Sequence, residues 1–243
     1  MVISGCASNP PSNPELRPNQ GTNEVARTNL NLAVEYMRTG DLETALERIN
    51  RAYAADPRYY YTHNIYGLLY QRLGDPALAE QHFKRAIALN SNDSDSKNNY
   101  GSFLCAEGRF TEAEETFLSA AKNPLYQTPE MAYANAGTCA VANKRPDLGE
   151  QYLRQALSIN PQLPVALLQM SQISYDQDNF LSARGYLQRF ETVSRHNPVS
   201  LLLGVKIEKV LGDTDAEASY EMLLRNNYSD SPQVQELNDI SRR

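Results

Sequence analysis

The sequence has little of what most enzymes, nucleic-acid-binding proteins and membrane-spanning proteins need. Its 243 residues include three histidines, three cysteines and no tryptophan. The uncharged apolar runs, such as PVALLQM and VSLLLGV, are far shorter than the roughly 20 residues of a membrane-spanning helix. Lysine and arginine total 23 against 29 acidic residues, which gives a formal net charge of −6. We find no basic stripe with interleaved aromatic residues, so we expect no nucleic-acid partner.

The residue patterns of catalytic and metal sites are missing as well. His63, His82 and His196 show no metal-ligand spacing to one another, to cysteines or to a carboxylate cluster. No phosphate-binding loop, nucleophile elbow or GxGxxG in a strand–helix context occurs. The acidic run TEAEETF is typical of a solvated helix face. We therefore expect a protein that is not an enzyme, with no catalytic or metal-binding residues, no cofactor and no small-molecule substrate.

What the sequence does contain is an internal repeat of about 34 residues. Segments that start at residues 26, 60, 94, 130, 164 and 197 align with one another. Two positions of these segments hold only small residues, which are Ala33, Gly67, Gly101, Gly137, Ser171 and Gly204, and Ala45, Ala79, Ala113, Gly149, Ala183 and Ala216. Because two antiparallel helices approach closely only where small residues meet, both columns predict a helix pair in each segment.

A third column predicts the turn within each helix pair. From the first to the sixth segment, this position holds Gly40, Gly74, Gly108, Lys144, Asp178 and Leu211. Glycine permits a tight turn, and the last three residues replace it in the later segments. Prolines such as Pro57 and Pro161 end the second helix, because proline cannot continue it.

The second segment carries the clearest family pattern. It reads NIYGLLYQRLGDPALAEQHFKRAIALN, and the matching positions are Tyr66, Gly67, Tyr70, Gly74, Ala79, Phe83 and Ala86. These residues resemble the tetratricopeptide repeat (TPR). The resemblance implies an all-α fold, a right-handed α-solenoid of about six helix-turn-helix repeats.

The repeats divide the chain into regions. Residues 7–23, ASNPPSNPELRPNQGTN, hold four of the 13 prolines and few apolar side chains. Such a segment cannot bury enough surface to offset the entropy of ordering it, so we expect a flexible tether. We expect the six-repeat solenoid over residues 24–230 and a polar C-terminal cap or tail over residues 231–243.

A solenoid of helix pairs presents a concave face lined by the first helix of each repeat. Four positions per repeat are expected to face it. Our candidates for this partner-binding groove are Leu30, Val34, Met37, Tyr61, Asn64, Leu68, Gln71 and Asn98. Apolar residues followed by amides suit an extended or amphipathic segment of a partner protein. Alternatively, Leu30, Val34 and Leu68 pack against a neighbouring repeat or the N-terminal segment.

Two cysteines, Cys105 and Cys139, fall on neighbouring first helices. A disulfide between them is conceivable in an oxidising compartment. It needs α-carbons within about 7 Å, whereas packed helices lie roughly 8–10 Å apart. We therefore expect two reduced cysteines that pack as small hydrophobic residues.

The third cysteine lies in a different setting. Ile3-Ser4-Gly5-Cys6 resembles the lipobox of bacterial lipoproteins, in which the cysteine is acylated. The basic and apolar parts of a signal peptide are missing before it, so residues 1–6 are interpreted as a truncated signal peptide with its lipobox. Three explanations of the missing leader stay open: the start codon was placed too late, the sequence was trimmed from a longer precursor, or the chain has a plain cytosolic N-terminus with an incidental cysteine. Ala7, where an aspartate would favour inner-membrane retention, favours the periplasmic face of the outer membrane, with a lipid anchor on Cys6.

Two longer blocks extend the resemblance. The first, NNYGSFLCAEGRFTEAEETFLSAAKNPLY, matches at Asn98, Asn99, Tyr100, Gly101, Phe103, Leu104, Gly108, Arg109, Ala113, Pro124, Leu125 and Tyr126. The second, SLLLGVKIEKVLGDTDAEASYEMLL, matches at Leu211, Asp213, Asp215, Ala216, Ser219, Tyr220 and residues 200–204. Both are similar to the type IV pilus biogenesis and stability lipoproteins, the PilF/PilW-type pilotins. The generic repeat does not account for Asn98-Asn99 or for Pro124-Leu125-Tyr126.

This second resemblance implies a monomeric TPR scaffold that binds a segment of the pilus secretin. It would promote secretin localisation to the outer membrane and secretin multimerisation, and so support twitching motility. Two alternatives remain open at this point: a cell-envelope TPR scaffold unrelated to pili, and an unlipidated cytosolic TPR adaptor.

Overall fold

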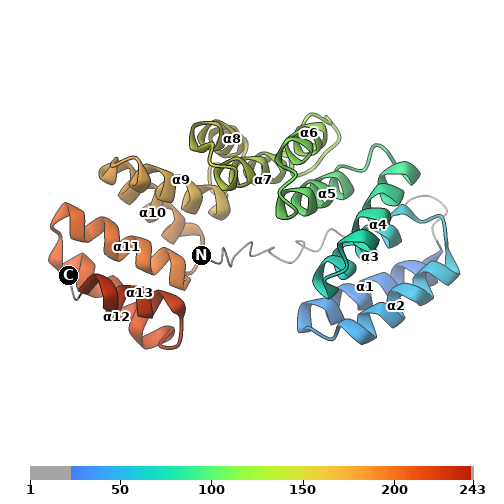
Figure 1. Ribbon diagram of the computed structural model, residues 1–243, viewed down its shortest axis with the longest axis horizontal. Coiled ribbons are helices and arrows are strands. Elements are labelled where there is room, and N and C mark those ends of the chain that lie inside the picture. Colours follow the sequence, from blue (N-terminus) through green and yellow to red (C-terminus); the bar gives the residue numbers. More distant parts are fainter. Residues whose placement is uncertain (1–22, 242–243) are drawn as a thin grey trace. The chain divides into compact units, whose positions relative to one another are not determined.

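The structure, a computed structural model, describes residues 23–241, which form thirteen α-helices and no β-strand (Figure 1). The chain divides into two compact units between Glu107 and Gly108. Unit 1 holds α1 (Glu24–Thr39), α2 (Leu42–Ala55), α3 (Tyr60–Leu73), α4 (Pro76–Leu89) and α5 (Ser94–Ala106). Unit 2 holds α6 (Phe110–Ala121), α7 (Pro129–Ala142), α8 (Pro146–Ile159), α9 (Pro164–Asp176), α10 (Phe180–Val193), α11 (Pro198–Leu211), α12 (Thr214–Asn227) and α13 (Pro232–Ser241). The predicted all-α fold is confirmed.

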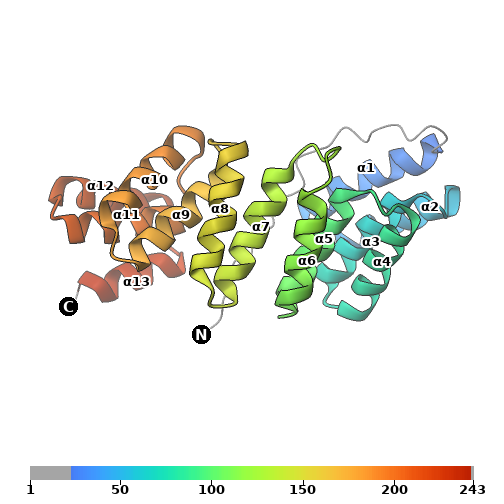
Figure 2. The ribbon, with the colours of Figure 1, turned by 90° about the horizontal axis from the view of Figure 1, so that it is seen from above.

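Within each unit, consecutive helices pack as pairs. In unit 1, α1 packs on α2 and α3 on α4, and in unit 2 the pairs are α7 with α8, α9 with α10 and α11 with α12. Figure 2 shows α7 and α8 lying side by side. None of the described helices is long and apolar enough to cross a lipid bilayer.

The turns follow the predicted column, with one correction. Gly40, Gly74 and Gly108 have φ angles of 85°, 76° and 74°, and the non-glycine residues Lys144 and Asp178 adopt 58° and 60°. In the sixth repeat the left-handed residue is Gly212, at φ 74°, so the assignment of Leu211 to the turn is wrong. The reason is that α11 has one residue more between its small residue and the turn than the other first helices.

Small residues allow the close helix pairing that the sequence predicts. In unit 1, a Cβ added to Gly67 of α3 would lie 2.6 Å from the ring of Phe83 in α4. In unit 2, a Cβ on Gly137 of α7 would lie 2.9 Å from the backbone carbonyl oxygen of Gly149 in α8. Contacts this short leave no room for any side chain, so the backbones of α7 and α8 approach each other directly.

This pairing predicts opposite effects for two glycine-to-alanine substitutions in unit 2. Gly137→Ala is expected to destabilise unit 2 by about 1–2 kcal/mol, because the new methyl group meets backbone and overpacks the contact. Gly185→Ala, inside α10 with no heavy atom within 4 Å of the added Cβ, is expected to stabilise it by about 0.5–1 kcal/mol. Urea denaturation followed by circular dichroism measures both; equal effects of the two substitutions would contradict the packing argument.

The C-terminal helix α13 closes unit 2 by packing on α11 and α12. Its Leu237 is fully buried in a cluster with Leu201, Leu202, Val205 and Leu224. A terminal repeat would otherwise expose this apolar surface, which a solenoid end must cover.

The cysteines of the repeats differ from expectation. Cys105 in α5 and Cys139 in α7 are both disulfide-bonded, so the expectation of two reduced thiols is wrong.

Candidate functional site

The residues of the predicted groove fall into two groups in unit 1. Four are buried, with exposed fractions of 0% for Leu30, 5% for Met37, 9% for Tyr61 and 1% for Asn64. The other four, Val34, Leu68, Gln71 and Asn98, are half-buried. Leu30, Met37 and Tyr61 belong to the apolar core of the first two repeats, and Val34 and Leu68 pack against that core. The half-buried four remain candidates for contact with a partner.

The first helices of the second and third repeats are joined by amides. Asn99 Nδ2 of α5 donates to Asn64 Oδ1 of α3 at 3.2 Å, and Ser102 Oγ donates to the Asn98 carbonyl at 3.1 Å. The bond between Asn99 and Asn64 gives a structural role to Asn99, which the generic repeat did not explain. It also accounts for the burial of Asn64, because a buried amide needs a hydrogen-bond partner.

A tyrosine cluster, formed by Tyr59, Tyr60 and Tyr61, precedes and opens α3. The three rings lie within 5.6–6.5 Å of one another, centroid to centroid. Burial raises the pKa of each phenol, and the nearby Asp93 adds to the increase. Burial also raises the pKa of Asp93, although its carboxylate accepts the Ser96 N–H at 2.8 Å. The cluster is neutral and largely apolar, and Tyr59 and Tyr61 are buried in the core of the first two repeats.

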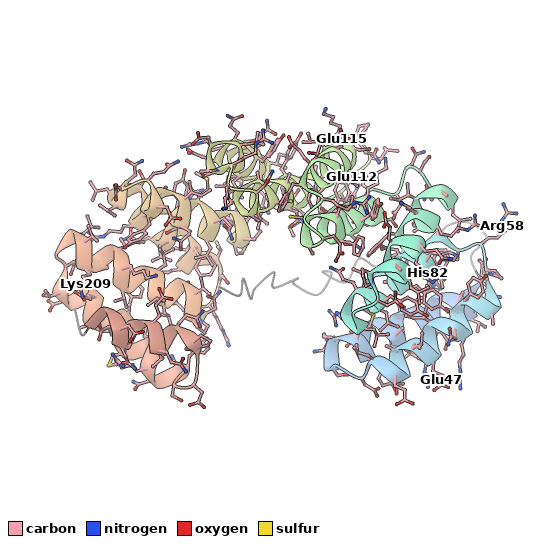
Figure 3. The ribbon with its side chains drawn as sticks, viewed as in Figure 1. Glu47, Arg58, His82, Glu112, Glu115 and Lys209 are labelled. Atoms are coloured by element: carbon pink, nitrogen blue, oxygen red, sulfur yellow. The ribbon has the colours of Figure 1, made fainter. Side chains whose placement is uncertain are left out.

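An open pocket of about 610 Å³ lies where α2, α3 and α4 meet. We call it the tyrosine–histidine pocket; its lining residues are Asn50, Tyr53, His63, Tyr66, Tyr70, Gln81, His82, Lys84, Arg85 and Ala88. The ring of His82 stacks on Tyr66 at 4.5 Å and on Tyr70 at 5.4 Å between centroids. Tyr66 donates its hydroxyl to Asn50 Oδ1 at 2.6 Å, which connects the stack to α2. Figure 3 shows His82 among the helices of unit 1, with Glu47 and Arg58 at the periphery.

Two histidines meet in this pocket. The Nδ1 atoms of His63 and His82 lie 3.0 Å apart, and His63 also hydrogen-bonds the backbone of Pro57. Each neutral imidazole carries a single N–H, so one of the two rings donates its Nδ1–H to the Nδ1 of the other. Burial lowers the pKa of His63, as does the charge of Arg85; burial and His63 lower the pKa of His82 to about 4.

The lowered pKa values predict that stability falls in mild acid. Above pH 6.5 the histidines are neutral in both the folded and the unfolded chain. Between pH 6.5 and about 4 the unfolded chain binds protons that the folded chain does not, so the free energy of unfolding falls. For His82 this loss is at most about 3 kcal/mol by pH 4, because solvent screens part of the shift on a half-buried ring. Urea denaturation at pH 7.5, 5.5 and 4.5 should show a steeper decline for the native protein than for His82→Phe, which keeps the ring stack. Parallel declines would contradict the prediction.

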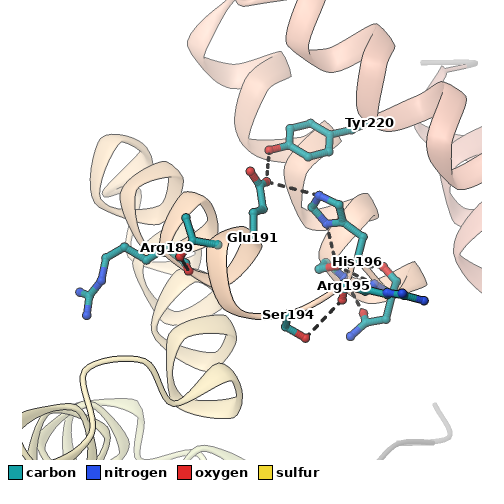
Figure 4. A network of polar contacts seen from close by, with 9 residues as sticks. Arg189, Glu191, Ser194, Arg195, His196 and Tyr220 are labelled. Carbon is teal, nitrogen blue, oxygen red and sulfur yellow. Dashed lines mark hydrogen bonds and ion pairs between the residues drawn. The ribbon is translucent and has the colours of Figure 1, made fainter.

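Polar contacts in unit 2 hold the last repeats together. Arg184 of α10 pairs with Glu208 of α11, with Nε 3.0 Å from Oε1, and Glu208 is 3% exposed. Figure 4 shows a second network, in which Glu191 accepts from the Tyr220 hydroxyl and lies 3.5 Å from Nε2 of His196. These contacts are structural, because each side chain finds its partner within the unit.

Other expectations concern catalysis and the lipid anchor. Among the described residues, no group of three or more histidines, cysteines and carboxylates is placed to hold a metal ion. In the acidic run TEAEETF, Glu112 and Glu115 are exposed on α6 (Figure 3), whereas Glu114 accepts from the Tyr152 hydroxyl at 2.6 Å. Cys6, the predicted lipidation site, lies outside the described residues, as do residues 1–22.

The sequence interpretation missed the tyrosine–histidine pocket. His63 and His82 are 19 positions apart in the sequence, a separation that matches no metal-ligand spacing. Helical geometry offered a signal: Tyr66 and Tyr70 are four residues apart on one face of α3, and His82 lies on the paired helix.

Comparisons with known proteins agree with this geometry. A family model described as tetratricopeptide repeat matches residues 30–94, 67–127 and 101–164. The type IV pilus assembly protein PilF of Pseudomonas aeruginosa is 30% identical over 234 residues, which cover 96% of this chain and 92% of PilF.

Two solved structures are similar over most of their length. A structure from the functional characterization of P. aeruginosa PilF has a TM-score of 0.77 and 29% identity, covering 89% of this chain and 97% of that chain. The crystal structure of PilW, described as a widely conserved type IV pilus biogenesis factor, has a TM-score of 0.77 and 31% identity. It covers 88% of this chain and 99% of the PilW chain. The chain belongs to the tetratricopeptide repeat proteins and, within them, to the PilF/PilW-type family.

Proposed function

We propose that the chain is a TPR scaffold for type IV pilus biogenesis that binds the pilus secretin and promotes its outer-membrane localisation and multimerisation. The observation that carries this proposal is the 30% identity to P. aeruginosa PilF across 96% of this chain. A likeness that extends over both units supports a shared role for the whole solenoid rather than for one repeat. The fold itself supports protein binding, because TPR units present extended surfaces for partners.

The proposed contact surface is the first-helix face of unit 1. Val34 and Leu68 offer apolar atoms, and Gln71 and Asn98 offer amides, all from half-buried positions. A secretin segment laid along them would bury the apolar atoms and contact the two amide side chains. The partner is a protein segment, and neither nucleic acid nor a small-molecule substrate is part of the proposal.

The proposed membrane attachment is covalent. Acylation of Cys6 would hold the chain at the periplasmic face of the outer membrane through residues 7–23. Each buried CH₂ of an acyl chain contributes about 0.8 kcal/mol, so two or more chains anchor a protein stably. Membrane fractionation of native protein and Cys6→Ser, both expressed behind a complete lipoprotein leader, tests this part. The native chain should sediment with outer membranes, and equal sedimentation of Cys6→Ser would contradict it.

Secretin binding is tested with purified full-length chain and the purified periplasmic region of the secretin from the same organism. We expect the double variant Gln71→Ala, Asn98→Ala to bind about tenfold more weakly, since a truncated contact at an interface centre costs more than 1 kcal/mol. Arg154→Ala, on the exposed face of α8, is the matched control and should bind like the native chain. Circular dichroism confirms that each variant is folded.

Two results would oppose the proposal. Absence of binding by the native chain would contradict the proposed secretin binding and favour a cell-envelope scaffold with another partner. Unchanged binding by the double variant, together with native folding, would exclude the first-helix face as the contact surface.

A further inference from the structure

We propose that the tyrosine–histidine pocket of unit 1 binds an acidic segment of a partner protein, with a carboxylate at Arg85 and an adjacent aromatic or apolar side chain on the stacked rings. This site is separate from the first-helix face to which the secretin is assigned above. The two proposals therefore succeed or fail independently.

The shape of the pocket fits one or two side chains of a docked segment. Its volume of about 610 Å³ falls in the range of ligand sites, roughly 300–1,000 Å³. Residues from three helices line it, which makes its walls part of the helix packing. Tyr53 of α2 stands edge-on to His63 at 5.7 Å and to Tyr66 at 6.3 Å, and it is 42% exposed.

The rings that an apolar or aromatic group can reach are Tyr53, which is 42% exposed, and Tyr70 and His82, which are half-buried; His63 and Tyr66 are buried beneath them in the stack. His63, Tyr66 and Tyr70 all stack on His82, with centroids 4.5–5.4 Å away and interplanar angles of 12–28°. Rings that are already ordered lose little entropy on binding. An aromatic side chain gains further from the offset and edge-to-face contacts that such a stack permits.

The charge of the pocket selects an anion. Among its ten lining residues, Lys84 and Arg85 are basic and none is acidic. Lys84 is compensated, because its Nζ lies 2.7 Å from Glu80 Oε1, one turn away on α4. Arg85 is exposed and close enough to lower the pKa of His63 by its charge. An arginine fork binds a carboxylate bidentately, so Arg85 supplies the anchor for an acidic residue.

The same features argue against other anions. A polyphosphate or nucleic acid requires several cations in a row, and here one uncompensated arginine faces neutral rings. The chain carries a formal net charge of −6, which repels a polyanion over longer distances. A single carboxylate beside an apolar group matches the pocket better than either.

The histidine pair adds a polar contact at neutral pH. Because the Nδ1 atoms of both rings face each other, Nε2 is the nitrogen of His82 that remains for a further contact. The backbone of a docked segment carries both an N–H and a carbonyl, so it can pair with that nitrogen in either tautomer. The arrangement therefore recognises a peptide, which has both the carboxylate and the amide, in preference to a free carboxylic acid.

The test is fluorescence polarisation with a labelled peptide of sequence GSGEFEFGSG and the full-length chain at pH 7.5. We expect saturable binding that weakens about tenfold with Arg85→Ala, the loss typical of a charged hydrogen-bond pair. Ala88→Phe, which leaves Arg85 in place but fills the pocket, should weaken binding to a similar extent. Arg51→Ala, on α2 outside the pocket lining, is the matched control and should bind like the native chain.

A glutamine analogue of the peptide, GSGQFQFGSG, and free glutamate separate the contributions. Binding of the glutamate peptide alone supports the proposal. Equal binding of the glutamine peptide, or unchanged binding by Arg85→Ala, would overturn it. Free glutamate that competes at equal concentration would show a simple carboxylate site and contradict the peptide claim. Self-association of the native chain that Arg85→Ala abolishes would replace the partner with a second copy of the chain.

Discussion

Replacing Arg184 by alanine is expected to cost about 3–5 kcal/mol of unfolding free energy in unit 2. The reason is the position of Glu208, which is 3% exposed on α11 and receives two donors from the Arg184 guanidinium. Without the arginine, a buried carboxylate keeps its desolvation penalty and loses the charge that compensates it. Asp213, 3.5 Å from Arg184, carries the same sign of charge as Glu208 and cannot compensate it.

The control for this prediction removes both charges. The double variant Arg184→Leu, Glu208→Leu should recover most of the lost stability, because no uncompensated charge remains buried. Arg154→Ala breaks an ion pair within α8 between Arg154 and Glu150 and should cost less than about 1 kcal/mol, as exposed pairs do. Urea denaturation of the three variants measures these differences. A loss of less than 1 kcal/mol for Arg184→Ala would show that water reaches Glu208 in the folded state.

Replacing Phe83 by alanine is expected to cost about 3–5 kcal/mol in unit 1. Phe83 is fully buried on α4 and fills the space that Gly67 leaves on α3. Its ring also lies 5.6 Å from Phe103 and 5.9 Å from Tyr100 on α5, centroid to centroid. One side chain therefore fills the contact between a helix pair and the next first helix, and its removal leaves a cavity at both contacts.

The matched control is Leu73→Ala at the end of α3. Leu73 is 46% exposed, so its truncation should change the stability by no more than about 0.5 kcal/mol. Denaturation of both variants, followed by circular dichroism, gives the comparison. Similar losses for Phe83→Ala and Leu73→Ala would contradict the assignment of Phe83 as the central packing residue of the second repeat.

Much of the fold could be predicted from the sequence because its rules are local. A small residue such as Gly137 is required wherever two backbones touch, whatever surrounds the pair. A turn residue with positive φ is required at a fixed number of residues after the small residue of the first helix. The misassignment of Leu211 shows the limit of this reasoning, since one added residue in α11 shifts the turn without changing the helical pattern.

The groove was harder to predict than the fold. A position on the first helix faces either the concave surface or the neighbouring first helix, and the repeat spacing is the same for both. Leu30 and Asn64 are buried by neighbours, one in an apolar core and one by its bond to Asn99. Gln71 and Asn98 keep partial exposure. Side-chain size and pairing across repeats decide between these outcomes, and neither is encoded in a single repeat.

The tyrosine–histidine pocket depends on three helices at once. Its residues are spread over α2, α3 and α4. Tyr66 and Tyr70 belong to the repeat pattern, but that pattern places no histidine beside them. Only the packing of α2 and α4 around α3 brings Asn50, His63 and His82 together. The pocket as a whole can therefore be recognised only after the helices have been packed together in three dimensions.

The measurement that tests the central claim most directly is the state of the secretin in cells that lack this chain. The gene is deleted, and secretin multimers in outer-membrane fractions are followed by their heat-resistant gel mobility, together with twitching motility. The account predicts loss of the multimers and of twitching, and recovery of both by the native gene. Normal multimers and normal twitching in the deletion strain would contradict it.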